Sequence, residues 1–275
     1  MRDKNYVIRV SSQKGGVGKT TIAVNLACAL SDMGYKTLLI DTDVSNPSVG
    51  FHLGLEEVNI GFTEFLTGKV SANRAILKYS TTGLHALPGT IHGVIPPEFK
   101  DEIFVHLKDK VDKLNYDFVV LDTAPGEIER AVIKGMDTFV DHAIIVTTPE
   151  LSSVTAGMRL AAMYDKHGID NDIVVNRLRN KSYEVQIDEI EESYGKKELA
   201  VFPEDDSVPE SIAMHIPVVI YNRQARFSKI AAKLAATYKH KGAVQPSEKQ
   251  TQKRPAKASF WHSLRLAFRR VFLGR

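Results

Sequence analysis

Apolar runs rich in β-branched residues alternate with segments of helical period over most of the chain. Short runs of this kind predict strands that are buried on both faces of a parallel sheet. Apolar residues that recur every three or four positions predict amphipathic helices between them. The strands are expected at 6–10, 36–40, 118–121, 143–146 and 172–175, and the helices near 18–32, 100–113, 127–136, 151–167 and 223–238.

This alternation predicts an α/β fold, a mostly parallel twisted sheet with helices on both faces. The length of 275 residues allows one or two domains, and no internal repeat divides the chain. We expect one globular domain over residues 1–238, because the composition changes from Lys239 onward.

Cysteine and histidine usage excludes several classes of protein. The chain has one cysteine, Cys28, and nine histidines that are never closer than seven positions apart. A disulfide framework and a cysteine-based zinc or iron–sulfur site within one chain are therefore excluded, and no H-x₃₋₅-H zinc spacing exists. The first residues lack the apolar run of a signal peptide, and no apolar run approaches the ~20 residues that span a bilayer. We expect an intracellular protein that does not cross a membrane.

The charge is distributed unevenly. Residues 239–275 hold ten Lys or Arg and one acid, a net charge of +9, whereas the other 26 basic and 32 acidic residues leave the body at −6. Residues 239–258 are polar, contain two prolines and predict a flexible basic linker. A basic tail on an acidic body indicates an anionic partner surface, either lipid headgroups or nucleic acid.

Residues 259–275 predict an amphipathic helix. Most large apolar side chains fall within an arc of about 140° when 260–273 are placed on a helix, with arginines outside it. Leu266 and Leu273 are exceptions on the far side. This distribution is typical of a helix that lies in the plane of an anionic membrane surface. A helix that docks on the body or on a partner protein is the alternative. The residues expected to enter the membrane are Phe260, Trp261, Leu264, Phe268, Val271 and Phe272.

A glycine-rich loop connects the first predicted strand to the first helix. Its glycines allow backbone N–H groups to surround phosphates, and the helix N-terminus adds a positive dipole. Lys19 is placed to reach the β- and γ-phosphates, and the Thr20 hydroxyl to bind Mg²⁺. A plain glycine-rich turn is the alternative. The expected nucleotide-binding residues are Gly15, Gly16, Val17, Gly18, Lys19, Thr20 and Thr21.

Carboxylates follow two of the predicted strands. Asp41 and Asp43 come directly after strand 36–40, and Asp122 follows strand 118–121. Ligands of α/β sheets bind at the carboxyl ends of the strands, so all three are expected near the phosphates. Asp122 is expected to hold Mg²⁺ through water. For Asp41 the alternative is capping of a helix at 47–53.

The sequence KGGVGKTT at 14–21 resembles the deviant Walker A motif of the MinD/ParA family of P-loop ATPases. The resemblance implies Mg²⁺-dependent, slow and partner-stimulated hydrolysis of ATP. It implies that Lys14 reaches the phosphates of a partner across a homodimer with ATP sandwiched between the subunits. It also implies that Asp43 positions the attacking water and that Asp41 supports the Mg²⁺ through water.

The same resemblance suggests adenine contacts. Asn176 would hydrogen-bond the base, and Pro203, Glu204 and Asp205 would form a second contacting loop. The alternative for residues 203–205, from the sequence alone, is an ordinary acidic turn.

The basic amphipathic tail favours a MinD-like over a ParA-like member. The first would cycle between cytoplasm and membrane to position division or other polar machinery, with activator and cargo proteins that the sequence does not identify. The alternatives are a ParA-like partition ATPase whose basic tail binds DNA, which is less favoured, and a membrane scaffold with negligible turnover. Single positions do not all favour the same member. Gln13 is ParA-like, whereas Val44 and Ser45, which follow Asp43, differ from the ParA pattern.

Overall fold

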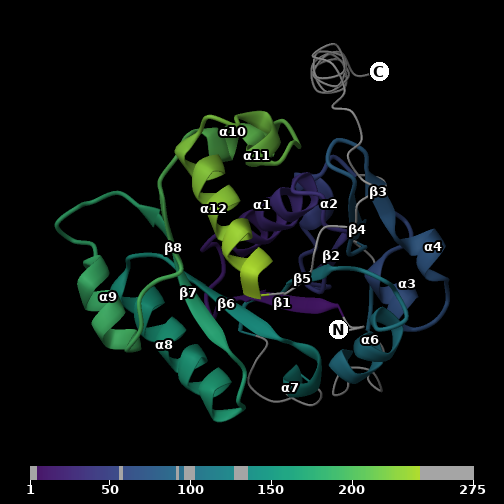
Figure 1. Cartoon of the computed structure of the whole chain (residues 1–275), viewed down its shortest axis with the longest axis horizontal. Coiled ribbons are helices and arrows are strands. Elements are labelled where there is room, and N and C mark those ends of the chain that lie inside the picture. The colour runs from purple at the N-terminus through teal and green to yellow at the C-terminus, as the bar shows by residue number, and fades with distance from the viewer. Residues whose placement is uncertain (1–4, 56–57, 91–92, 96–102, 127–135, 242–275) are drawn as a thin grey trace.

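The computed structural model describes residues 5–55, 58–90, 93–95, 103–126 and 136–241 (Figure 1). Eight strands form one sheet in the order β3-β4-β2-β5-β1-β6-β7-β8. Neighbouring strands pair in parallel except β3 and β4, which pair antiparallel at one edge. The strands are β1 (Tyr6–Ser11), β2 (Thr37–Asp41), β3 (Leu77–Tyr79), β4 (Leu84–Leu87), β5 (Phe118–Asp122), β6 (His142–Thr147), β7 (Asn171–Leu178) and β8 (Ala200–Pro203).

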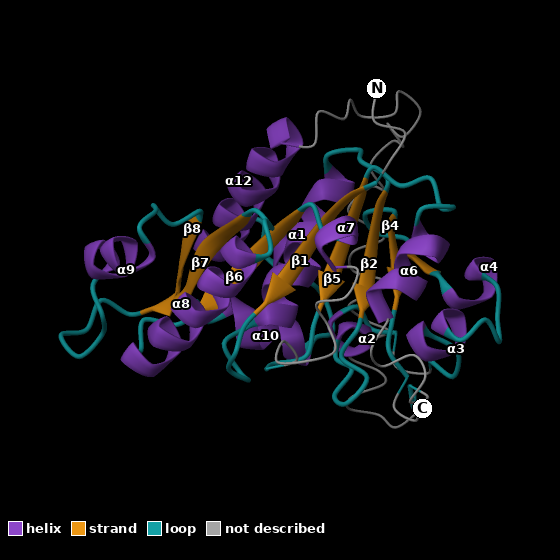
Figure 2. Ribbon diagram, turned by 90° about the horizontal axis from the view of Figure 1, so that it is seen from below, coloured by secondary structure: helices purple, strands orange, loops and turns teal. Residues whose placement is uncertain are grey.

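Helices cover both faces of the sheet (Figure 2). Helices α1, α11 and α12 bury one face, and α3, α6 and α8 bury most of the other. The helices are α1 (Lys19–Asp32), α2 (Val49–His52), α3 (Phe62–Leu66), α4 (Ala72–Ala75), α6 (Ile103–Val111), α7 (Met136–Phe139), α8 (Leu151–Lys166), α9 (Ile187–Tyr194), α10 (Ser207–Ala213), α11 (Val218–Tyr221) and α12 (Arg226–Lys241). No helix in these ranges is long and apolar enough to span a bilayer.

The α/β fold with a mostly parallel sheet is confirmed. All five predicted strands are present, and β7 continues to Leu178, so Asn176 lies inside the strand and not after it. The sequence analysis missed β3, β4 and β8, which have three or four residues each and lie at or near the sheet edges. The predicted helix at 127–136 lies almost entirely outside the described residues, as do most of the linker and all of the tail helix.

Successive residues of β1 point to opposite faces of the sheet. Ile8 and Val10 pack on the α1 side, while Val7 packs on the α6 side. Arg9 shares that second face and is fully buried, and its guanidinium lies 5.0 Å from the ring centroid of Phe104. None of the guanidinium nitrogens of Arg9 has a hydrogen-bond partner among the described residues. The aromatic face therefore supplies a cation–π contact for this buried charge.

The single cysteine lies in the middle of the first long helix. Cys28 in α1 is completely buried in the core between α1 and the sheet. Burial is the main cause that raises the pKa of its thiol far above the ordinary value. Cys28 behaves as a small apolar core side chain.

Candidate functional site

The glycine-rich loop lies at the carboxyl end of β1 and leads into α1. Gly16 and Gly18 have φ values of +76° and +96°, in the left-handed region that favours glycine. A Cβ on Gly18 would lie 2.2 Å from Nδ2 of Asn176, which itself donates to the carbonyl oxygen of Val17 at 2.8 Å. The loop conformation therefore requires glycine for both steric and backbone reasons.

The first residues of α1 point their polar atoms toward the ends of neighbouring strands. Lys19 is buried and its Nζ donates to Oγ of Ser12 at 3.3 Å. Thr20 Oγ1 donates to Oδ2 of Asp122 at 2.6 Å and lies 2.9 Å from Oγ of Ser48. The structure thus brings together a lysine, a hydroxyl and a carboxylate at the carboxyl ends of β1 and β5.

The carboxylate of Asp122 suits a magnesium ion. It is 1% exposed, and its Oδ1 has no hydrogen-bond partner among the described residues. Burial, and next the charge of Asp41, raise the pKa of Asp122 well above its ordinary value. A buried unpaired carboxylate oxygen beside a threonine hydroxyl matches the oxygen ligands that Mg²⁺ prefers.

The described residues contain no group of three or more His, Cys, Asp or Glu arranged to hold a metal ion. Mg²⁺ does not need such a cage. It keeps several waters and is bound by one or two carboxylates together with the phosphates of a nucleotide. The pair of Thr20 and Asp122 is therefore sufficient on the protein side.

Asp41 caps the start of a short helix. Its Oδ2 accepts hydrogen bonds from the amides of Ser48 at 2.9 Å and Val49 at 3.0 Å, and its Oδ1 accepts one from the amide of Asp43 at 3.1 Å. The structure shows the capping role that the sequence left open as the alternative. Support of Mg²⁺ through water stays a prediction.

Burial raises the pKa of Asp41 to about 7, against the opposing effect of the three amide hydrogen bonds. The folded protein therefore binds protons on Asp41 between about pH 4 and pH 7, where the unfolded chain has released them. The contribution of Asp41 to the free energy of unfolding therefore falls as the pH rises through this window. The metal-free protein is thus expected to melt at a higher temperature at pH 6 than at pH 8, as measured by circular dichroism.

Asp41→Asn is expected to reduce this pH dependence, because the amide side chain does not titrate. The matched control is Asp188→Asn, which changes an exposed carboxylate on α9 and should leave the pH dependence as it is. A melting temperature that rises from pH 6 to pH 8 would contradict the raised pKa.

Asp43 lies in the loop after β2 and is largely buried. Its Oδ1 accepts hydrogen bonds from the amides of Ser45 at 3.1 Å and Asn46 at 2.9 Å. The preceding residue, Thr42, donates to the carbonyl oxygen of Asp122 from both its amide and its hydroxyl, at 2.8 Å each. The charge of Asp43 also contributes to raising the pKa of Asp122. The structure places Asp43 beside the cluster of Thr20 and Asp122, and its role in positioning water stays a prediction.

Lys14 does not point into this cluster. Its Nζ donates to Oγ of Ser152, in the first turn of α8. The glycines that follow it, Gly15 and Gly16, are exposed. Lys14 and Lys19 therefore hold different positions, one on the outer side of the loop and one buried beneath it.

The residues expected at the adenine base are only partly gathered. Asn176 lies under the phosphate loop, whereas Glu204 forms an ion pair with Arg179, 2.8 Å from Nε to Oε2. Asp205 accepts the amides of Ser207 at 3.0 Å and Phe227 at 3.1 Å, tying the starts of α10 and α12 together. Although burial raises the pKa of Asp205, these hydrogen bonds outweigh it, and the pKa lies below the ordinary value.

These contacts give Asp205 the structural role of the acidic-turn alternative. Its base-contacting role stays a prediction, as do those of Pro203 and Glu204. The expected membrane residues, from Phe260 to Phe272, lie outside the described residues.

Three serines complete the site and were missed by the sequence analysis. The hydroxyl of Ser12 accepts a hydrogen bond from Lys19 and donates to the carbonyl oxygen of Lys14 at 2.5 Å. Ser48 contacts Thr20 through its hydroxyl and Asp41 through its amide. The hydroxyl of Ser152 accepts a hydrogen bond from Lys14. Ser12 adjoins the glycine-rich motif and was open to prediction. Ser152 is far away in sequence, and only the fold brings it to the loop.

Known proteins resemble this chain over nearly its whole globular part. The family profile described as "ParA: NUBPL iron-transfer P-loop NTPase" matches residues 3–238. An uncharacterized ATP-binding protein of Methanocaldococcus jannaschii is 31% identical over 84% of this chain and 86% of its own length. The septum site-determining protein MinD of Thermotoga maritima is 29% identical over 86% of this chain and 89% of its own length.

A solved structure agrees with these relatives. The septum site-determining protein MinD of Pyrococcus horikoshii, complexed with Mg-ADP, superposes with a TM-score of 0.76 at 29% identity. The match covers 87% of this chain and 98% of that one. From the phosphate loop, the fold and these similarities we conclude that the chain belongs to the ParA/MinD family of P-loop NTPases and is an ATPase that uses ATP and Mg²⁺.

Proposed function

We propose that this ATPase is a MinD-like switch that dimerises when ATP is bound and then binds a membrane through its C-terminal helix. Hydrolysis of ATP would separate the dimer and release it to the cytoplasm. The position of Lys14 is the observation that carries this proposal. The globular domain over 1–238, the linker over 239–258 and the helix over 259–275 are its three working parts.

Lys14 supports the dimer step because its ammonium lies away from its own Lys19, Thr20 and Asp122. A cation on the outer side of a phosphate loop is suited to a nucleotide held by a second subunit. Delivery of a positive charge in trans stabilises the charge that develops on the transferred phosphoryl group. Hydrolysis would then require the homodimer, with ATP sandwiched between the subunits.

The membrane step is supported by the sequence of the tail. One amphipathic helix with a single apolar face binds a membrane weakly. Two helices on one dimer bind together, and their combined affinity is about 10²–10⁴ times higher when both reach the surface. Dimerisation by ATP would therefore control residence on the inner face of the membrane.

Two other functions fit less well. A ParA-like partition ATPase would bind DNA through the basic tail. Binding to DNA phosphates would use the arginines of the tail but would leave its aromatic side chains at 260–272 without a role. An iron-transfer role, as in the printed name of the matching family, would need cysteine ligands, and the chain has only the buried Cys28. The proposed switch would also need two kinds of partner, an activator of hydrolysis and a cargo protein.

Sedimentation with anionic liposomes in ATP, ADP and no nucleotide tests the proposal. We expect strong binding only in ATP, with a blue shift of the fluorescence of Trp261, the single tryptophan of the chain. Phe268→Glu places a charge on the apolar face and should abolish binding. Leu266→Glu places the same charge on the opposite face of the predicted helix and should reduce binding much less.

Equal loss in both variants would contradict an oriented membrane helix. Binding to duplex DNA but not to liposomes would favour the ParA-like alternative. Membrane binding in ATP without measurable hydrolysis would identify a scaffold and not a cycling switch.

A further inference from the structure

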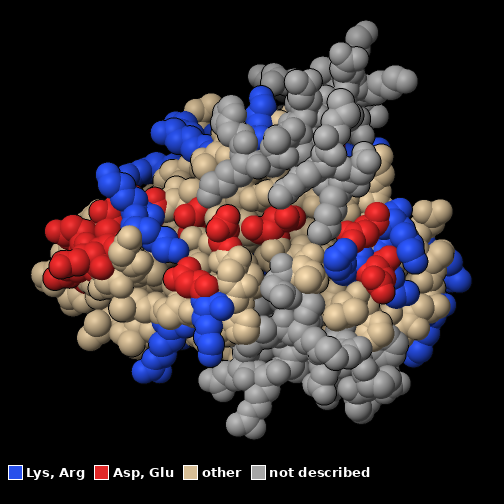
Figure 3. All heavy atoms as spheres, turned by 60° about the horizontal axis from the view of Figure 1, so that its bottom comes forward, with Lys and Arg blue, Asp and Glu red and all other residues tan. Residues whose placement is uncertain are grey.

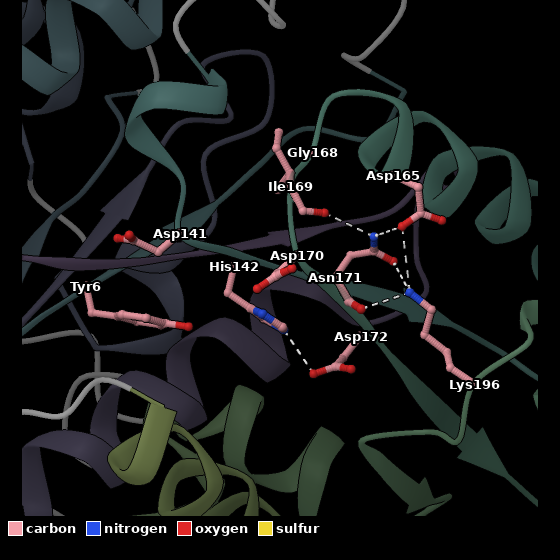
Figure 4. A pocket seen from close by; sticks show the side chains of 10 residues that line it. All are labelled: Tyr6, Asp141, His142, Asp165, Gly168, Ile169, Asp170, Asn171, Asp172 and Lys196. Carbon is pink, nitrogen blue, oxygen red and sulfur yellow. Dashed lines mark hydrogen bonds and ion pairs between the residues drawn. The ribbon is translucent and has the colours of Figure 1, made fainter.

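An acidic pocket lies at the amino ends of β1, β6 and β7, the sheet edge opposite to the nucleotide site. Its volume is about 660 Å³ (Figure 4). Four carboxylates line it, against one lysine and one histidine. These side chains are Asp141, Asp165, Asp170, Asp172, Lys196 and His142.

The walls of the pocket are fixed by internal contacts. His142 is buried in β6, and its Nε2 lies 3.0 Å from Oδ2 of Asp172. Asn171 donates to Oδ1 of Asp165 at 2.7 Å and accepts from Nζ of Lys196 at 2.9 Å. The one lysine is thus used within the wall, where it is 3.9 Å from Asp165.

The pocket carries an excess of negative charge. The lower side of the molecule in Figure 1, which faces the reader in Figure 3, gathers acidic side chains in a band across its middle. Burial, and next the charge of Asp172, raise the pKa of the neighbouring Tyr238 hydroxyl well above its ordinary value. Asp165 and Asp170 are exposed, so the negative potential is open to a partner.

The last described helix brings the chain to the rim of this pocket. The ring of Tyr238 in α12 lies 5.3 Å from that of His142 and 6.5 Å from that of Tyr6, and both of these residues line the pocket. Figure 4 shows the end of α12 (yellow) beside them. The helix ends at Lys241, about one turn beyond Tyr238. The described part of the chain therefore ends about one helical turn beyond a residue that contacts the pocket lining.

We propose that the acidic pocket binds the basic segment 242–258 of the same chain. The segment holds Lys249, Lys253, Arg254 and Lys257 against one acid, Glu248. Its 17 residues span about 20–25 Å as a flexible chain, so its lysines reach a pocket that begins at the end of α12. The short connection gives the pocket and the segment an effective concentration on the order of millimolar, so that a weak ionic contact is populated.

Docking of the segment stands on charge and position alone. Its consequence for membrane binding rests on the proposed function. A basic segment held by carboxylates is not available to anionic lipid, so pocket and membrane would compete for it. An anionic surface would then need to displace the segment before the dimer binds tightly.

Zero-length crosslinking of the full chain with a carbodiimide tests the docking. The reagent joins carboxylates to lysine amines that are already in contact, and mass spectrometry of tryptic peptides identifies the pairs. We expect crosslinks from Asp165 and Asp170 to Lys249, Lys253 or Lys257, within single chains. Salt at about 0.5 M should reduce their yield several-fold, because it screens contacts between exposed charges.

The variant Asp165→Asn/Asp170→Asn removes two exposed carboxylates and should lower crosslinking of the segment to the body about fivefold or more. The matched control is Asp188→Asn/Glu192→Gln, which removes two exposed carboxylates from α9 and should leave the yield unchanged. Circular dichroism melting of both variants verifies that they fold.

Crosslinks that go equally to α9 and to the pocket, or only between two chains, would overturn the proposal. Unchanged crosslinking of the segment in the Asp165/Asp170 variant would overturn it as well. Liposome sedimentation of the same variant separates the two ideas. Docking with no effect on membrane binding would leave the pocket assigned and refute only the competition.

Discussion

Asp43→Asn is expected to lower the rate of ATP hydrolysis about 100-fold or more while ATP still binds. Asp43 directly follows Thr42, which is hydrogen-bonded to Asp122, so it lies near the cluster of Thr20 and Asp122, where a carboxylate can orient and activate water. Asparagine keeps the side-chain oxygen that accepts the amides of Ser45 and Asn46 but lacks the basic carboxylate. The loop should therefore stay in place, and phosphate release under saturating ATP measures the loss.

Asp43→Ala is the comparison that separates chemistry from structure. It removes the acceptor for both amides and should lower the melting temperature, whereas Asp43→Asn should not. If the asparagine variant hydrolyses ATP normally and only the alanine variant fails, Asp43 holds the loop and does not act on water. Loss of nucleotide binding in the asparagine variant would also contradict the assigned role.

Lys14→Ala is expected to reduce hydrolysis by about 10³-fold or more, the scale on which a cation supplied in trans accelerates phosphoryl transfer. A more decisive test is whether this variant restores activity when it is mixed with a second inactive variant. In a dimer of Lys14→Ala with Asp43→Asn, one site receives an intact Lys14 from one subunit and an intact Asp43 from the other. An equal mixture of the two inactive proteins should therefore regain about a quarter of the normal rate, if subunits pair at random.

A mixture that stays inactive would contradict delivery of Lys14 across the dimer, provided that both variants still dimerise by light scattering in ATP. The control mixture is Lys19→Ala with Asp43→Asn. Lys19 is buried beneath its own loop and bonded to Ser12, so it acts within its own subunit. Loss of Lys19 and Asp43 from different subunits leaves no complete site, and no activity should return.

The central strands could be predicted because each is a continuous apolar run flanked by polar turns. β3, β4 and β8 escaped because they are short, and β8 ends in Pro203, which sequence patterns assign to a turn. Their pairing depends on neighbours far away in the chain, such as Leu38 with His85 and Val175 with Val201. The local sequence pattern of a strand does not indicate which distant strand it pairs with.

The phosphate-binding residues could be predicted because they lie together in one loop and one helix turn. The position of Asp122 followed from its place after a buried strand. The contact of Lys14 with Ser152 spans 138 positions in the sequence and needed the fold. The capping of α2 by Asp41 was only the alternative interpretation of the local sequence, and the hydrogen bonds of its carboxylate show it.

The burial of Cys28 has a consequence for chemical labelling. A thiol whose pKa lies far above neutrality forms almost no thiolate, and only the thiolate attacks maleimides and disulfides. The folded domain therefore presents no reactive thiol of its own. A cysteine placed in the tail would be the single reactive thiol of the native protein, while reaction of Cys28 itself would report opening of the core around α1.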